Sequence, residues 1–272
     1  MIPAAFDYAR AESVDHAIQL LSGDPEAKLL AGGHSLLPLM KLRFAQPSTL
    51  IDIGRLSDLS YVREDGDEVA IGALTRHHDV ESSDALHELC PIVSYTASTI
   101  GDPQVRHIGT IGGSVAHADA ASDMPTVLLA LDASLVAQGP GGTRTIPAGE
   151  FFVGLFTSAL EPNEVLTEIR VPKRTAGWSY QKFHRRAQDW AMVGVAAVQM
   201  NGGAHVALTN MSDRPLRASA VEQALAGGAD PATAAASAAE GTAPPSDVFG
   251  SAEYRKELSK VLVRRALEDT MG

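Results

Sequence analysis

A stripe of apolar residues with the helical period opens the chain. Ser13 precedes this stripe as a good N-cap, and Gly23 follows it where helices commonly end. Apolar runs at 28–31 and 50–53 then predict two strands, the second ended by Gly54. Residues 1–55 are therefore predicted to form a small α+β lobe. The stripe consists of Val14, Ala17, Ile18 and Leu21.

The middle of the chain has a pattern of hairpins and helices. Short apolar runs on either side of Asp65-Gly66 are typical of a tight β-hairpin. Thr75 is expected to cap a helix that reaches Ser82, and Pro125 suits the first turn of a later helix. Residues 56–172 are assigned to a second lobe. Its expected elements are strands at 61–63, 68–71, 135–137, 144–146 and 165–171 and helices at 75–82, 85–100 and 125–131.

The last third of the chain changes from strands to helices. Gln188-Asp189 and the glycine turn 201–203 separate three apolar runs, which predict a short antiparallel meander. Residues 173–272 are therefore assigned to a third lobe, and the fold class is α+β. Its expected elements are strands at 178–184, 191–200 and 204–209 and helices at 219–226, 231–240 and 252–268.

Composition narrows the function. The 272 residues can form one large domain or two to three small ones. The net charge is −11 and basic residues cluster only between Lys182 and Arg186, which argues against a nucleic-acid partner. No leader and no apolar run of roughly 18 residues is present, so we expect a cytoplasmic protein without a transmembrane segment. Cys90 is the only cysteine, so this sequence cannot supply the four thiolates of an iron–sulfur cluster.

Two glycine-rich segments carry the main chemical signal. Ala31-Gly32-Gly33-His34-Ser35 follows an apolar strand, and Thr110-Ile111-Gly112-Gly113-Ser114 lies in a longer glycine-rich stretch. Glycines at strand ends allow consecutive backbone N–H groups to turn toward an anion, so the two segments together predict a clamp for phosphates. A Rossmann dinucleotide site is disfavoured, because it needs glycines spaced G-x-G-x-x-G. Here the two glycines of each pair are adjacent, and the two pairs lie about eighty residues apart.

The residues around the second glycine pair resemble a known family. Val105-Arg106-His107-Ile108-Gly109-Thr110 leads into this pair, and Ser122-Asp123 follows it. In order and spacing these motifs resemble the FAD-binding medium subunit of molybdenum hydroxylases, the group of aerobic carbon monoxide dehydrogenase and the flavin part of xanthine dehydrogenase. The resemblance runs from Pro3 to the C-terminal helix and departs at Ser114, where the family more often has Asn, and at Trp190. It implies a two-lobed FAD-binding fold of the PCMH (vanillyl-alcohol-oxidase-like) type plus a C-terminal α+β lobe with a small antiparallel sheet.

The resemblance also implies the flavin-binding residues. Asp123 would accept hydrogen bonds from FAD hydroxyls, although it could merely cap a helix. Lys182 would lie near the pyrimidine edge of the flavin, and Trp190 could reach the ring. His34 is expected beside the pyrophosphate, although a similar GGHS segment carries covalent flavin in berberine-bridge-type oxidases. The expected cofactor-binding residues are Ala31, Gly32, Gly33, His34, Ser35, Leu36, Thr110, Ile111, Gly112, Gly113, Ser114, His117, Asp119, Ser122, Asp123, Lys182 and Trp190.

The family further implies an assembly. Noncovalent FAD would be bound here, the molybdenum cofactor by a large subunit, and two [2Fe–2S] clusters by a small subunit, commonly in a dimer of heterotrimers. Electrons from carbon monoxide, an N-heteroaromatic or an aldehyde would reach FAD and leave to an external acceptor, with the complex cytoplasmic or at the inner membrane face. The alternatives are a stand-alone FAD oxidase or reductase and an interaction protein that has lost FAD. His77-His78 could suggest a metal, but no ligand spacing accompanies this pair, so a helix surface is expected.

Overall fold

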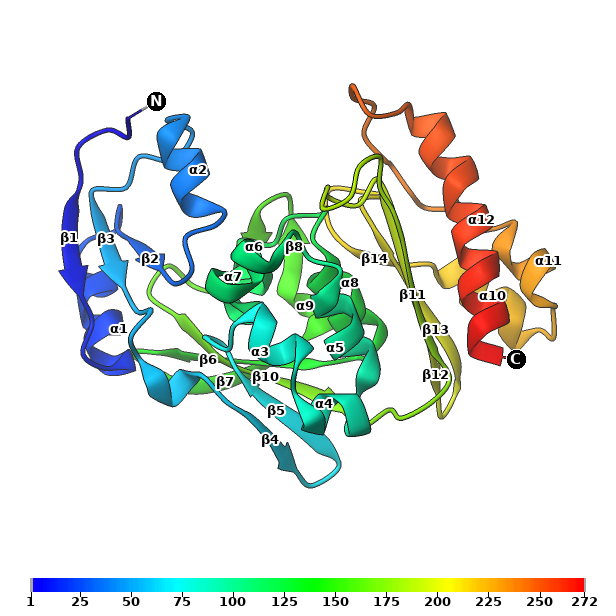
Figure 1. The fold of residues 1–272 in the computed structure, drawn as a ribbon, viewed down its shortest axis with the longest axis horizontal. Coiled ribbons are helices and arrows are strands. Elements are labelled where there is room, and N and C mark those ends of the chain that lie inside the picture. The colour runs from blue at the N-terminus through cyan, green and yellow to red at the C-terminus, as the bar shows by residue number, and fades with distance from the viewer. Residues whose placement is uncertain (1, 272) are drawn as a thin grey trace.

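The structure is a computed structural model that describes residues 2–271. Three larger sheets follow one another across the molecule, with the N-terminal sheet at one end and the C-terminal helices at the other (Figure 1). None of the helices in the described residues combines the length and apolarity needed to cross a membrane. The α+β class predicted from the sequence is confirmed.

The N-terminal sheet is parallel, with strand order β1-β3-β2. The predicted first helix is confirmed, since the Ser13 hydroxyl accepts a hydrogen bond from the His16 N–H and the apolar stripe is buried except for the half-buried Val14. The strand β1 was not predicted, because its residues are mostly exposed and show no apolar alternation. The elements are β1 (Asp7–Arg10), α1 (Val14–Gly23), β2 (Lys28–Leu30), α2 (Leu36–Lys41) and β3 (Thr49–Asp52).

The middle sheet has five antiparallel strands in the order β4-β5-β10-β6-β7. Gly66 in the first hairpin has φ +60°, which glycine adopts at little cost. The hairpin predicted at Asp65-Gly66 is confirmed, and the strands predicted at 135–137 and 144–146 pair with each other as a second hairpin. A small two-stranded sheet of β8 and β9 was not foreseen. The strands are β4 (Val62–Asp65), β5 (Glu68–Gly72), β6 (Ser134–Gly139), β7 (Gly142–Pro147), β8 (Phe152–Gly154), β9 (Thr157–Ser158) and β10 (Val165–Pro172).

The helices above this sheet differ from the prediction in three places. The expected helix over 85–100 is wrong, because Pro91 has no N–H and begins a new helix instead. The expected cap at Thr75 is also wrong, since its hydroxyl exchanges hydrogen bonds with the backbone of Tyr61. The glycine-rich stretch forms α6 and α7 rather than a loop. The elements are η1 (Ser57–Leu59), α3 (His77–Glu81), α4 (Asp84–Leu89), α5 (Pro91–Ser98), α6 (Pro103–Ile108), α7 (Ile111–His117), α8 (Asp123–Ala130) and α9 (Ala148–Phe151).

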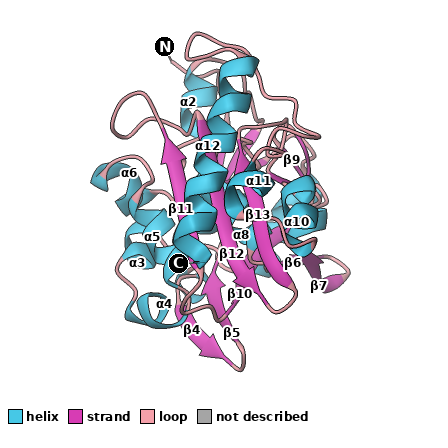
Figure 2. Cartoon of the chain, turned by 90° about the vertical axis from the view of Figure 1, so that its right-hand side faces the viewer, coloured by secondary structure: helices cyan, strands magenta, loops and turns pink. Residues whose placement is uncertain are grey.

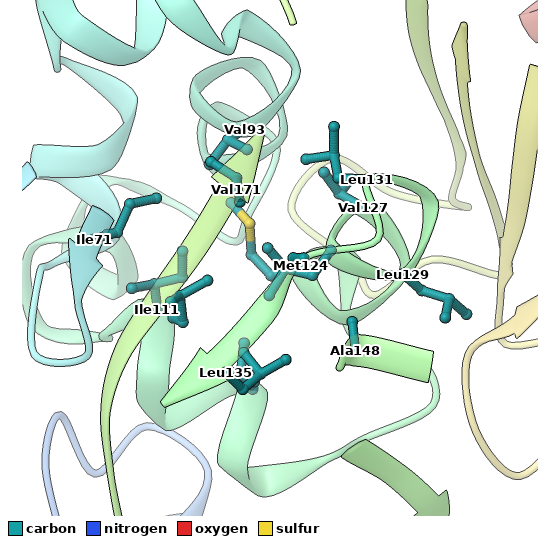
Figure 3. Packing of buried hydrophobic residues seen from close by; sticks show 14 of the residues in the cluster. Ile71, Val93, Ile111, Met124, Val127, Leu129, Leu131, Leu135, Ala148 and Val171 are labelled. Atoms are coloured by element: carbon teal, nitrogen blue, oxygen red, sulfur yellow. The ribbon is translucent and has the colours of Figure 1, made fainter. Parts of the chain in front are cut away.

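The helix α8 is at the centre of the molecule. Each of its residues is buried, and it contacts α5 and α7 on one side and the strands β12 and β13 on the other. Figure 3 shows side chains of this helix, among them Met124 and Val127, in one cluster with Ile111 and Val171. A mostly apolar helix is stable when neighbouring elements cover it, and this burial fixes the position of the residues at its start.

The C-terminal sheet is an antiparallel meander with strand order β11-β12-β13-β14, as the sequence predicts for its first three strands. The helix α12 crosses one face of the sheet, beside α10 and α11 (Figure 2). The predicted helix over 231–240 ends at Ala235, and the last helix extends to Met271. The elements are β11 (Trp178–Phe183), β12 (Val193–Met200), β13 (Gly203–Thr209), β14 (Leu216–Arg217), α10 (Ser219–Ala226), α11 (Pro231–Ala235) and α12 (Ala252–Met271).

Truncation of Leu128 is expected to destabilise the whole chain. This side chain is fully buried in α8, so Leu128→Ala should lower the free energy of unfolding by about 2–5 kcal/mol. The measurement is urea unfolding followed by circular dichroism. Leu42→Ala is the control, because Leu42 is 50% exposed and its truncation should change stability by less than about 0.5 kcal/mol. Equal unfolding midpoints for the two variants would contradict the central role of α8.

Candidate functional site

A cavity of about 610 Å³ lies between the N-terminal sheet, the middle helices and the segment 184–192 that joins β11 to β12. Its volume falls in the range of about 300–1,000 Å³ that is usual for sites of small molecules and cofactors. Both glycine segments line it. Its wall extends from Leu21 near the N-terminal sheet to Trp190 beyond the C-terminal sheet, so the cavity suits an elongated ligand.

The two glycine segments lie against each other. A Cβ added to Gly32 would overlap the carbonyl oxygen of Ile108 and stand 2.9 Å from the Cα atom of Gly109. A Cβ on Gly113 would lie 3.9 Å from the Cβ atom of Ala31. Glycine is therefore needed at position 32 because two backbones meet there. The two segments, which are about eighty residues apart in the sequence, thus line one cavity.

The first segment has free hydrogen-bond donors. Within residues 2–271, the backbone N–H groups of Gly32, Gly33 and His34 have no acceptor. Gly33 has φ +74°, a left-handed conformation that aligns neighbouring N–H groups and is rare for other residues. The His34 ring lies with Nδ1 3.1 Å from the carbonyl oxygen of Gly32. This segment thus has the unsatisfied donors that an anion such as a phosphate requires.

The second segment differs from the prediction. Its N–H groups are already used, since Ile111 donates to the Thr75 carbonyl, Gly112 to the Ala73 carbonyl and Gly113 to the Thr110 hydroxyl. Thr110 is the N-cap of α7, so this glycine pair occupies the first turn of a helix. A Cβ on Gly112 would stand 2.5 Å from the Cβ of Ala73. The second pair therefore serves close packing, and the expectation that both segments cradle an anion through backbone N–H groups is wrong for this one.

The buried residue His77 holds the backbone immediately before the second segment. The His77 N–H donates to the Gly109 carbonyl over 3.0 Å, and the Arg76 guanidinium donates to the Ile108 carbonyl. His77 is 3% exposed, so the expected helix surface at this position is wrong. Its Nδ1 is buried without a partner in the described chain. Burial lowers the pKa of His77 to about 4, helped by the charges of Arg106 and His34, so the ring is neutral at pH 7.

An ion pair forms the far wall of the cavity. The Lys182 ammonium lies 2.9 Å from Asp123 Oδ2 and 2.9 Å from the Thr99 carbonyl oxygen, and both charged side chains are less than 10% exposed. The Tyr180 hydroxyl donates to Asp123 Oδ1 over 2.5 Å. Burial raises the pKa of Asp123, whereas Lys182 and Tyr180 lower it. An ammonium has three donors and a carboxylate about four acceptor positions, so the pair keeps hydrogen-bonding capacity for a ligand.

Two aromatic groups stand beside this polar wall. Trp190 is 57% exposed at the mouth of the cavity. The His117 ring stacks on Phe156 with 5.0 Å between centroids, and burial lowers the pKa of His117 against the opposing charge of Asp119. The cavity lining therefore includes the aromatic side chains of His117 and Trp190 as well as the ion pair.

Most of the sequence-predicted residues share this wall. Two do not: the Ile111 side chain lies in the apolar core, as Figure 3 shows, and Asp119 is outside the lining, where its carboxylate accepts from the Ala121 N–H. The residues on the wall are Ala31, Gly32, Gly33, His34, Ser35, Leu36, Thr110, Gly112, Gly113, Ser114, His117, Ser122, Asp123, Lys182 and Trp190.

Sequence reasoning missed other parts of the wall. Gly101, with φ +51°, belongs to the glycine-rich stretch and had a detectable signal. His77 and the segment 160–166 had none, because only tertiary packing brings them to the cavity. Within residues 2–271, no group of three or more His, Cys, Asp or Glu side chains could hold a metal ion.

Comparison with known proteins adds the family. Residues 4–174 match the family described as "FAD binding domain in molybdopterin dehydrogenase", and residues 178–270 match "CO dehydrogenase flavoprotein C-terminal domain". The carbon monoxide dehydrogenase medium chain of Hydrogenophaga pseudoflava is 43% identical over 98% of this chain and 97% of its own length. The glyceraldehyde dehydrogenase medium chain of Sulfolobus acidocaldarius is 40% identical over 99% of each chain.

A solved structure agrees with these relatives. A carbon monoxide dehydrogenase from Hydrogenophaga pseudoflava that lacks the Mo-pyranopterin moiety of the molybdenum cofactor superimposes with a TM-score of 0.94 at 45% identity. The superposition covers 99% of this chain and 98% of that chain. The similarity therefore extends over the glycine segments, the polar wall and the C-terminal sheet together.

Replacement of His77 is expected to change the pH dependence of stability. Its folded pKa of about 4 is below the ordinary 6.5, so between these values only the unfolded chain binds the proton. The neutral His77 ring therefore makes its full contribution to the free energy of unfolding above pH 6.5, and this contribution is lost as the pH falls toward 4. Between pH 7 and pH 5 the free energy of unfolding of wild type should fall by about 2 kcal/mol through this residue, and that of His77→Gln should fall correspondingly less.

The measurement is urea unfolding at pH 7, 6 and 5. His78→Gln is the matched control, since the neighbouring His78 is only half-buried and this variant should follow wild type. Parallel pH profiles for wild type and His77→Gln would contradict the assigned protonation state.

Proposed function

The chain belongs to the family of FAD-binding medium chains of molybdopterin dehydrogenases, and from this premise we propose that it is the flavin-carrying electron-transfer subunit of a molybdenum-containing hydroxylase. It is an oxidoreductase subunit with an FAD-binding domain. The observation that carries the proposal is one cavity walled by the N-terminal sheet, both glycine segments and the C-terminal sheet. The whole-chain similarity covers each of these parts.

The residues of the cavity fit FAD. Gly32, Gly33 and His34 present three N–H groups that have no acceptor in the described part of the chain, which suits a pyrophosphate. Asp123 and Lys182 keep acceptor and donor capacity on the wall, which suits the hydroxyl groups and the polar ring edge of a flavin. When bound, FAD accepts two electrons together and releases them singly, so it joins two-electron to one-electron carriers.

Each part of the wall then has its own task. The N–H groups of the first segment would donate to the phosphates, while the second segment holds Gly32 in place through close packing. Asp123 would accept hydrogen bonds from FAD hydroxyls, and Lys182 has a third donor that could serve the polar edge of the flavin. Trp190 would lie beside the ring. The remaining proposed contacts come from Ala31, Ser35, Leu36, Thr110, Gly112, Gly113, Ser114, His117 and Ser122.

The other cofactors would belong to partner subunits. Cys90 is fully buried and its pKa is raised to about 12, so the single thiol of this sequence is not suited to ligate a cluster. We place the [2Fe–2S] clusters on a small subunit and the molybdenum cofactor on a large one, in a heterotrimer that pairs with a second copy. Electrons would pass from molybdenum through the clusters to FAD and on to an external acceptor, in the cytoplasm or at the inner membrane face.

The substrate of the complex is a separate question. The two medium chains named above belong to dehydrogenases of carbon monoxide and of glyceraldehyde, although they share about the same identity with this chain. Their similarity therefore supports the electron-transfer role and favours no single substrate. The proposed lobes at 1–55, 56–172 and 173–272 stay a prediction, which the three separate sheets support.

The isolated full-length chain is expected to bind FAD without oxidising a donor. Reconstituted protein should show flavin absorption bands, and acid precipitation should release the flavin into the supernatant. Carbon monoxide, an aldehyde or an N-heteroaromatic should be oxidised only after the iron–sulfur and molybdenum subunits are added. Turnover by the chain alone at about 1–10³ per second would favour the stand-alone oxidase instead. Flavin in the acid pellet would indicate covalent attachment through His34.

Asp123→Asn is expected to weaken FAD binding more than Asp119→Asn. Asparagine is chosen because alanine would leave the buried Lys182 ammonium without its partner. Loss of a charged acceptor should raise the FAD dissociation constant roughly 10- to 100-fold. Asp119 is outside the cavity lining, so its variant is the matched control. Fluorescence titration measures both constants, and equal values would reject the assignment of Asp123.

A further inference from the structure

The strand β11 connects the polar wall to the C-terminal helix. Side chains alternate between the two faces of a strand, and here the alternation separates two sets of contacts. Ser179 and Gln181 face α12, where both donate to Asp269. Tyr180 and Lys182 face α8, where both donate to Asp123. The start of α8 is therefore held by two successive side chains on one face of a neighbouring sheet.

The Tyr180 hydroxyl has a defined position behind the cavity. Tyr180 is 4% exposed and does not line the cavity, whereas Asp123 and Lys182 do. Gly194, which pairs with Lys182 on β12, leaves the space that the hydroxyl occupies. A Cβ there would stand 3.0 Å from the Tyr180 oxygen and 2.7 Å from Thr209 Oγ1. The absence of a side chain at Gly194 therefore leaves room for the hydroxyl beside the carboxylate.

The two donors hold the carboxylate at both oxygens. Tyr180 donates to Oδ1 over 2.5 Å and Lys182 to Oδ2 over 2.9 Å. One hydrogen bond would leave a carboxylate free to rotate about its Cβ–Cγ bond, whereas two bonds from one strand fix its plane. Each oxygen keeps a further acceptor position. The orientation of these remaining positions depends on both donors.

We propose that Tyr180 is a positioning residue for the flavin site: its hydrogen bond to Asp123 Oδ1 keeps the free acceptor positions of that carboxylate directed at the cavity. The inference rests on the proposed FAD-binding function and extends it to a residue that the cofactor does not touch. The C-terminal sheet then contributes to the binding site in two ways, through Lys182, which lines the cavity, and through Tyr180, which does not.

The same hydrogen bond affects protonation of Asp123. Burial raises the pKa of Asp123, and the groups that lower it are Lys182, the Tyr180 hydroxyl and His184. Loss of the hydroxyl lets the pKa of Asp123 rise further, so the carboxylate is protonated at a higher pH. FAD affinity in a Tyr180 variant should therefore begin to fall at a higher pH than in wild type.

The test is Tyr180→Phe in the full-length chain, which keeps the ring and removes the hydroxyl. We expect the FAD dissociation constant at pH 7 to rise about tenfold. Tyr61→Phe is the matched control, because the Tyr61 hydroxyl also donates to a carboxylate, that of Glu168, at a distance of 2.6 Å. Neither of these two residues lines the cavity. This control should leave the constant within about a factor of two. Urea unfolding of each variant identifies conditions in which the chain is folded.

A double-mutant cycle separates positioning from packing. In an Asp123→Asn background, Tyr180→Phe should change the dissociation constant less than about twofold, because the orientation of a carboxylate is no longer involved. An equal loss in both backgrounds, or a pH profile like that of wild type, would overturn the proposal. If wild type binds FAD and Tyr180→Phe binds it equally well, the positioning role fails and the flavin function stands. If wild type binds no FAD, both fail.

Discussion

The close approach of backbone to backbone at glycine is the constraint on which this site depends. Gly32 lies against Ile108, and Gly112 lies against Ala73, at separations that a Cβ would not permit. The first contact joins the N-terminal sheet to the segment before α7, and the second joins α7 to the end of β5. The free N–H groups of the first segment keep their place because the second segment, with its own donors satisfied, supports them.

Much of the fold could be predicted from local patterns. The helix α1 has a cap and an apolar stripe, and the hairpin of β4 and β5 has Asp65-Gly66 at its turn. The stretch from Gly101 to Ser114 was harder, because Gly112 and Gly113 lower the helix propensity of the residues that form α7. The structure nevertheless forms two short helices there, each begun by a residue whose side chain accepts a backbone N–H, Asp102 in α6 and Thr110 in α7. Capping prevailed over propensity in this stretch.

The candidate site was predictable where it follows contiguous motifs and unpredictable where it depends on packing. The helical turn of α7 sends Ile111 into the core, although both of its neighbours line the cavity. His77 reaches the cavity because α6 packs over α3, which no spacing in the sequence reveals. Tyr180 acts through a carboxylate on another element, so only coordinates can identify it.

The distribution of the wall along the chain has a consequence for biosynthesis. Chains emerge from the ribosome N-terminus first, so both glycine segments are complete long before β11 exists. Until that strand emerges, Asp123 has neither Lys182 nor Tyr180 as a partner and α8 lacks the sheet that covers it. Closure of the cavity is therefore a late event in synthesis, and a chain interrupted before Phe183 would expose an apolar helix to the proteases and chaperones that recognise unfinished proteins.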